Sequence, residues 1–103
     1  MNNWLSLSIT ELHENLDKWL LVDIRDPRSF EQGHIPGAIN LNNNNLQSYI
    51  DENDFETPIV VVCYVGNSSQ GAADLLSSVG FQTVYSLSGG MSMWRTQYPD
   101  KVE

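Results

Sequence analysis

The stretch PIVVVC at residues 58–63 decides the fold of this chain, and the loop YVGNSS at residues 64–69 follows it directly. Its β-branched residues run without alternation between polar and apolar positions. Such a run predicts a strand buried on both faces, as in the centre of a parallel sheet. The Gly-Asn pair in the loop ends the strand. Apolar residues at helical spacing over residues 72–79 then predict a helix that ends at Gly80.

Further strands and helices alternate along the rest of the chain. Four more strands are expected at residues 4–7, 19–24, 38–41 and 82–87. Helices are expected over residues 9–17 behind a Ser8 capping box, after the cap Asp26, around residues 46–50, and after Gly89 and Gly90. This alternation predicts an α/β fold: a single domain over residues 1–103, with three layers (α/β/α) around a mostly parallel five-stranded sheet.

Composition excludes several classes of function. The chain has 103 residues, 41% of them hydrophobic, which is enough for one core. Thirteen acidic residues against five basic ones give a net charge of −8, which opposes binding to nucleic acid or to an anionic membrane. A single cysteine, Cys63, allows no internal disulfide. No signal-peptide pattern and no membrane-length apolar run is visible, so we expect a cytoplasmic protein whose thiol stays reduced. The sequence leaves the oligomeric state open.

Cys63 stands where open parallel sheets bind their ligands, between the end of a strand and the start of a helix. Backbone N–H groups and the positive end of the helix dipole favour a thiolate there and lower its pKa. The same loop can hold a dianion with its main-chain donors and the hydroxyls of Ser68 and Ser69. The alternative is that Cys63 is simply a small buried core residue.

Other candidate residues have structural interpretations. His13 and His34 are not brought beside Cys63 by local spacing, so a cysteine–histidine pair of the papain kind is not supported. We expect His34 to stabilise the turn at residues 33–37 through a hydrogen bond. His13, His34 and Cys63 form no metal motif. Arg25 could assist at the mouth of the site, but a structural ion pair with Asp23 is the favoured interpretation.

Trp94 and Arg95 are expected to be core and surface residues of the last helix rather than ligands of a substrate.

Four stretches, taken in order, resemble one known family. They are LVDIR at residues 21–25, GHIPGA at 33–38, CYVGNS at 63–68 and LSGGMSMW at 87–94. Together they resemble the landmarks of the single-domain rhodaneses, or thiosulfate sulfurtransferases, and are most similar to the small bacterial GlpE type. The resemblance spans nearly the whole chain.

The resemblance implies a sulfur carrier. The Cys63 thiolate would take the outer sulfur of thiosulfate, release sulfite and form a persulfide. It would pass that sulfur to a thiophilic acceptor, cyanide in an assay or a dithiol such as thioredoxin or dihydrolipoate, by a ping-pong mechanism. The implied catalytic residue is Cys63, and no cofactor or metal is implied. The implied substrate-binding residues are Tyr64, Val65, Gly66, Asn67, Ser68 and Ser69.

The sequence departs from the family at one point and leaves two rival interpretations. Ser68 stands where many members have Arg, and the loop holds no cation, so we expect weak affinity for thiosulfate. One rival is a sulfur-relay or non-catalytic rhodanese module. The other is a cysteine phosphatase or arsenate reductase, which would need an arginine where Ser69 stands.

Overall fold

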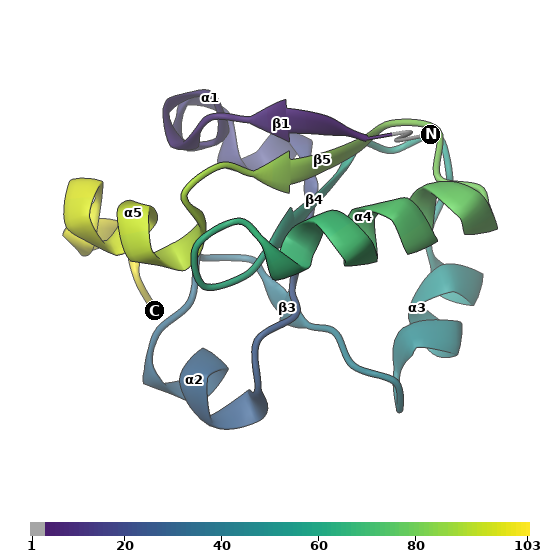
Figure 1. Cartoon of the computed structure of the whole chain (residues 1–103), viewed down its shortest axis with the longest axis horizontal. Coiled ribbons are helices and arrows are strands. Elements are labelled where there is room, and N and C mark those ends of the chain that lie inside the picture. The colour runs from purple at the N-terminus through teal and green to yellow at the C-terminus, as the bar shows by residue number, and fades with distance from the viewer. Residues whose placement is uncertain (1–3) are drawn as a thin grey trace.

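Five parallel strands form one sheet in the computed structural model, which describes residues 4–103. The strand order is β1-β5-β4-β2-β3 (Figure 1), with bounds β1 Leu5–Leu7, β2 Leu20–Asp23, β3 Ile39–Asn40, β4 Ile59–Val62 and β5 Val84–Leu87. All of β4 is buried and it lies at the centre, as predicted. Every pairing is parallel, so the sheet is wholly rather than mostly parallel. The first three residues of the domain expected over residues 1–103 lie outside the described residues.

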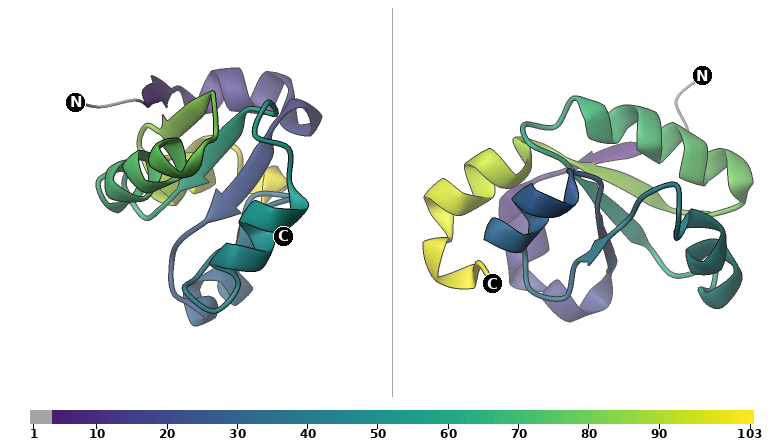
Figure 2. Two further views of the ribbon diagram at one scale, coloured as in Figure 1. Left: turned by 90° about the vertical axis from the view of Figure 1, so that its right-hand side faces the viewer. Right: turned by 90° about the horizontal axis from the view of Figure 1, so that it is seen from below.

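Helices cover both faces of this sheet. Their bounds are α1 Ile9–Glu14, α2 Pro27–Gln32, α3 Leu46–Glu52, α4 Ser68–Val79 and α5 Gly90–Gln97, with 3-10 turns at Leu16–Lys18 and Pro99–Lys101. Leu12 of α1 and Trp94 of α5 belong to one apolar cluster, whereas Tyr49 of α3 and Leu76 of α4 belong to another. Alternate residues of β4 contribute to the two clusters, so these lie on opposite faces. Figure 2 shows α1 and α4 on opposite sides of the sheet, which confirms the three layers.

The caps predicted from sequence are formed. The backbone N–H of Glu11 donates to Ser8 Oγ at 3.1 Å, and the N–H of Ser29 donates to the Asp26 carboxylate at 3.3 Å. α4 ends at Val79 with Gly80 as its C-cap, at a φ of +131° that favours glycine. Local hydrogen-bonding groups therefore set these helix ends before any tertiary contact is considered.

The first helix is shorter than expected. It was predicted to continue to Asp17, but α1 ends three residues earlier, and a 3-10 turn at Leu16–Lys18 takes its place. Asn15 causes the break: its backbone leaves the helical region, with φ −145°, and its N–H donates to the carbonyl of Leu12 at 3.2 Å. Asparagine has a low helix propensity, so ending the helix at this position costs little.

Candidate active site

Cys63 directly follows β4, and the loop through residues 64–67 leads into α4 at Ser68. Because this loop follows the end of β4 and all strands are parallel, it lies at the edge of the sheet where the strands have their carboxyl ends. In Figure 1 it lies between α4, α5 and α2. The side chain of Cys63 is buried, with only 2% of its surface exposed. The residue is thus placed at the edge where the sequence argument expected it.

Polar groups surround the sulfur of Cys63. The backbone N–H of Gly66 donates to Sγ at 3.1 Å, and Ser69 Oγ lies 3.3 Å from Sγ. Burial raises the pKa of the thiol, but the Ser69 hydroxyl and the backbone N–H groups of Ser69, Gly66 and Val65 act against it, and the net pKa lies below its ordinary value. The interpretation of Cys63 as a core residue accounts for its burial but not for these donors.

A second buried hydroxyl stands behind the first. Ser69 is fully buried, and its Oγ lies 2.7 Å from Oγ of Ser86 in β5, which is also buried. Ser86 is not among the residues predicted from the sequence to form the site. The available signal was its position two residues after Val84, which places it on the same face of β5 as a core valine. A small polar side chain at such a position needs a partner, and none could be named without the fold.

The start of α5 fixes the backbone of the loop. Met91 donates its N–H to the carbonyl of Cys63 at 2.8 Å, and Ser92 donates to the carbonyl of Tyr64 at 2.9 Å. Gly90 makes this approach feasible, because a Cβ there would lie 2.6 Å from the Cys63 carbonyl oxygen, and its φ of +55° also favours glycine. The Gly-Gly pair recognised in the sequence is therefore a close contact with the cysteine loop.

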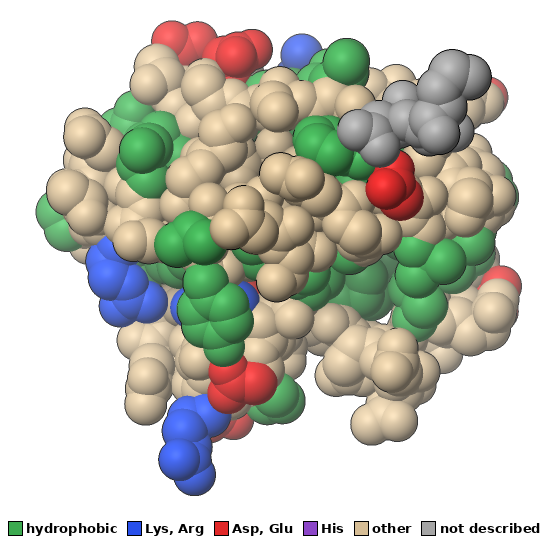
Figure 3. Space-filling model, in the orientation of Figure 1, with side chains coloured by type: hydrophobic (Ala, Val, Ile, Leu, Met, Phe, Trp, Pro, Cys, Tyr) green, Lys and Arg blue, Asp and Glu red, His purple; other side chains and the backbone are tan. Residues whose placement is uncertain are grey.

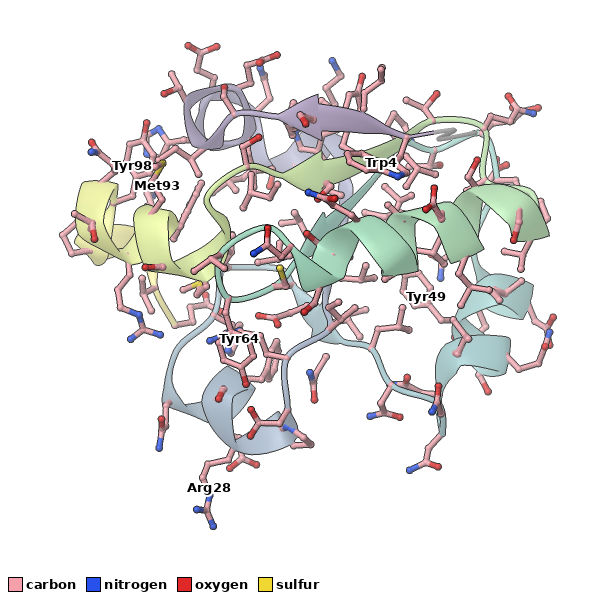
Figure 4. The ribbon with its side chains drawn as sticks, viewed as in Figure 1. Trp4, Arg28, Tyr49, Tyr64, Met93 and Tyr98 are labelled. Carbon is pink, nitrogen blue, oxygen red and sulfur yellow. The ribbon has the colours of Figure 1, made fainter. Side chains whose placement is uncertain are left out.

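On its outer side the loop contacts α2 through Tyr64. The phenol is about half exposed, donates to the Asp26 carboxylate and lies 3.2 Å from Ser29 Oγ. Figure 4 shows the Tyr64 side chain pointing toward α2. The hydrogen bonds from Tyr64 and Ser29 lower the pKa of Asp26 to about 2. Asp26 thus caps α2 and anchors the loop at the same time.

The remaining residues predicted to bind substrate face outward. Val65, Asn67 and Ser68 are exposed, and Val65 borders a hollow of about 430 Å³ that is also lined by Met93 of α5. A second hollow, of about 370 Å³, lies on the other side of the loop, between α2, α3 and α4. The structure therefore brings Gly66 and Ser69 to the sulfur and leaves the other predicted loop residues at the surface.

The buried guanidinium of Arg25 is paired with groups other than the sulfur. The Arg25 side chain is 4% exposed, and its Nη2 donates to the Asp23 carboxylate at 2.8 Å and to the Gly33 carbonyl at 2.7 Å. It serves as the structural ion pair that was favoured from sequence, with its guanidinium 5.8 Å from the centre of the Tyr64 ring. On the face seen in Figure 3, most Lys and Arg side chains lie around α2 and α5 rather than over the loop.

The two histidines have other partners. His34 stacks on Phe30 and its Nδ1 lies 2.9 Å from the Phe30 carbonyl, in agreement with the predicted role in the turn. His13 stacks on Tyr98 with ring centres 3.9 Å apart. Trp94 is fully buried and Arg95 is exposed, also as expected. Within residues 4–103, no three His, Cys, Asp or Glu side chains are grouped to hold a metal ion.

Comparison with known proteins identifies the family. The model of the rhodanese-like domain matches residues 8–97, and the chain belongs to the rhodanese family. It is 48% identical over 99 residues to a protein named thiosulfate sulfurtransferase GlpE from Pseudoalteromonas translucida (strain TAC 125), covering 94% of each chain. This similarity agrees with the GlpE type inferred from the motifs. No helix in residues 4–103 combines the length and hydrophobicity of a membrane span.

Solved structures show the same fold. A rhodanese-related protein from Thermoplasma volcanium aligns with a TM-score of 0.81 and 28% identity, covering 97% of this chain and 98% of that one. A protein of unknown function from Rhodopseudomonas palustris, described as a possible tyrosine phosphatase, aligns with a TM-score of 0.75 and 29% identity, covering 90% of this chain and 80% of that one. The fold is therefore shared by chains to which different chemistries are ascribed, and the site residues must decide between them.

Proposed function

We propose that this chain is a thiosulfate sulfurtransferase in which Cys63 carries the transferred sulfur. The observation that supports it most strongly is the sulfur environment: a buried Sγ that receives the N–H of Gly66 and lies 3.3 Å from the Ser69 hydroxyl. Such donors favour a thiolate, which is the nucleophilic form of cysteine. The similarity to a thiosulfate sulfurtransferase over nearly the whole chain supports the choice of thiosulfate as donor.

In the first half-reaction the Cys63 thiolate attacks the outer sulfur of thiosulfate. A new S–S bond forms to Sγ, the S–S bond of thiosulfate breaks, and sulfite leaves with the bonding electron pair. The product is a Cys63 persulfide with a negative charge on its outer sulfur. We expect the backbone N–H groups of Val65, Gly66 and Ser69, which lower the pKa of the Cys63 thiol, to stabilise that charge as the donors of an oxyanion hole do.

In the second half-reaction an acceptor attacks the outer sulfur and the Cys63 thiolate leaves. Cyanide gives thiocyanate. A dithiol takes the sulfur as a persulfide, then closes to a disulfide and releases hydrogen sulfide. The two steps share one covalent intermediate, so ping-pong kinetics are expected. Thioredoxin and dihydrolipoate are the acceptors we propose, in the cytoplasm, where a lone thiol remains reduced.

The buried and the exposed residues of the loop have different roles in this proposal. Gly66 and Ser69 hold the sulfur, and the exposed Ser68, Asn67, Val65 and Tyr64 form the surface that the substrate meets. No cation lies in the loop, so the thiosulfate dianion depends on amides and hydroxyls alone, in a chain of net charge −8. We therefore expect a high KM for thiosulfate.

Steady-state thiocyanate formation tests the proposal. The wild type should turn over many times, with parallel double-reciprocal lines for thiosulfate and cyanide, and Cys63→Ala should be inactive. A single stoichiometric transfer without turnover would favour the sulfur-relay module instead. Hydrolysis of an aryl phosphate would favour the phosphatase. We expect none, because Ser69 stands where a phosphatase of this kind needs an arginine.

A further inference from the structure

Ser86 is a buried polar residue that the proposed reaction leaves without a role. It lies in β5 beside Val61 of the central strand, and 3% of its surface is exposed. Its neighbour on the same face, Val84, belongs to the apolar core beneath α4. Burying a hydroxyl is unfavourable unless it is hydrogen-bonded. A valine or alanine would suit this layer better, so the hydroxyl needs an explanation.

The hydroxyl of Ser86 is directed to one partner. Within the described chain, the hydrogen bond of its Oγ is with Ser69 Oγ, at 2.7 Å. Ser69 Oγ in turn lies 3.3 Å from Cys63 Sγ. The three side chains form a row from β5 to the sulfur, and all three are buried.

Counting hydrogens gives this row a direction. Each serine hydroxyl has one hydrogen to donate and can accept from others. When Cys63 is a thiol, the row holds three hydrogens for two contacts, so one hydrogen has no acceptor within the row. When Cys63 is a thiolate, Ser86 donates to Ser69, Ser69 donates to the sulfur, and every hydrogen is used. The row is fully satisfied in the charged state.

We propose that Ser86 is a positioning residue that directs the hydroxyl hydrogen of Ser69 toward the sulfur of Cys63. This inference rests on the proposed function of Cys63 as the nucleophile. Ser86 touches neither the sulfur nor the substrate, and it acts only through Ser69. Its donation also polarises the Ser69 hydroxyl, which strengthens the bond that Ser69 makes to the thiolate.

Titration of the thiolate by its ultraviolet absorbance, with alkylation rate as a second measure, tests this role. Ser86→Ala should raise the pKa of Cys63 by about half a unit, which corresponds to about a threefold smaller ionisation constant. Ser78→Ala is the matched control, because the Ser78 hydroxyl donates to the Leu75 carbonyl at the far end of α4. That control should leave the pKa unchanged.

A double-mutant cycle separates positioning from a merely structural role. If Ser86 acts through Ser69, the variant with both Ser69→Ala and Ser86→Ala should have the same Cys63 pKa as Ser69→Ala alone. Additive shifts, or no shift in Ser86→Ala, would overturn the proposal. Should Ser86→Ala fold poorly, Ser86→Thr and Ser86→Val form a nearly isosteric pair. Thr should retain the wild-type pKa and Val should raise it, and equal pKa values in the two would be a negative result.

The titration contains no thiosulfate, so its outcome is independent of the sulfur-transfer assay. A shifted pKa in a protein that forms no persulfide would support the role of Ser86 and reject the proposed function. An unshifted pKa in an active enzyme would do the reverse.

Discussion

The cysteine loop is held differently on its two sides. On the inner side, backbone hydrogen bonds from α5 fix the carbonyls of Cys63 and Tyr64, and the buried hydroxyl of Ser69, which contacts Ser86 of β5, lies at the sulfur. On the outer side, one half-exposed phenol contacts α2. Buried contacts cannot be replaced by water, whereas exposed ones can. Substitutions on the inner side should therefore change the pKa and reactivity of Cys63, and substitutions on the outer side should change only the binding of substrate.

The largest effect is expected where α5 meets the loop. Gly90→Ala would place a Cβ 2.6 Å from the Cys63 carbonyl oxygen at a φ of +55°, so either α5 or the loop must move. We expect a loss of more than about 2 kcal/mol in the free energy of unfolding. Urea unfolding gives this value, and thiocyanate formation by the remaining folded protein should be abolished.

Gly71→Ala is the matched control for that substitution. Gly71 lies in α4, and a Cβ there would meet nothing within 4 Å. Alanine should therefore stabilise the protein by about 0.5–1 kcal/mol through its helix propensity. Equal stabilities of the two variants would mean that the close approach of α5 to the loop is not a constraint.

The next effect concerns the inner hydroxyl. Ser69→Ala removes a hydrogen bond to the thiolate and leaves Ser86 without its partner. The pKa of Cys63 should rise by about one unit, and sulfur transfer below that pKa should slow about tenfold. The rate in the wild type should rise with pH with a midpoint below the ordinary thiol pKa of 9.0, since the folded value is lowered.

Ser68→Ala tests the outer side of the loop with the same substitution one residue before Ser69. Ser68 is exposed and its hydroxyl is not at the sulfur, so the pH profile should keep its midpoint. If Ser68→Ala and Ser69→Ala shift the midpoint by the same amount, buried and exposed loop residues do not have different roles.

The sequence predicts the features of this molecule that depend on local patterns better than those that depend on contacts between distant residues. The run at residues 58–63 was sufficient to place the central strand and Cys63 at its end, because burial on both faces leaves a local pattern. The end of α1 before Asn15 was not predicted, because the apolar spacing continues through Leu16 although the helix does not. Ser86 was missed because its partner is 17 positions away, and only the sheet order brings them together.

A cation added to the outer side should help the substrate without altering the sulfur. Ser68→Arg places a positive charge on the exposed start of α4 and should lower the KM for thiosulfate about fivefold at low salt. The gain should fade as salt is added, because exposed charges are screened. Ser78→Arg adds the same charge at the far end of α4, and its KM should match that of the wild type. A micromolar KM in the wild type would contradict the expected weak binding.

The smallest effect is expected at the outer contact. Tyr64→Phe removes the phenol that donates to Asp26, and the pKa of Asp26 should move from about 2 toward its ordinary value of 3.8. A lowered carboxyl pKa stabilises the folded state fully above the unfolded value, and this stabilisation is lost as pH falls through the folded value. The variant should therefore be less stable than the wild type above pH 3.8, and the difference should disappear as pH falls from 3.8 to about 2. Carboxyl titration by NMR measures the shift, and kcat near neutral pH should change little.

The most direct test of the central claim is the intact mass of the reduced protein after brief treatment with thiosulfate. The wild type should gain one sulfur atom, Cys63→Ala should gain none, and cyanide should remove the added sulfur as thiocyanate. An unchanged mass at high thiosulfate, or an equal gain in Cys63→Ala, would contradict the assignment of Cys63 as the sulfur carrier.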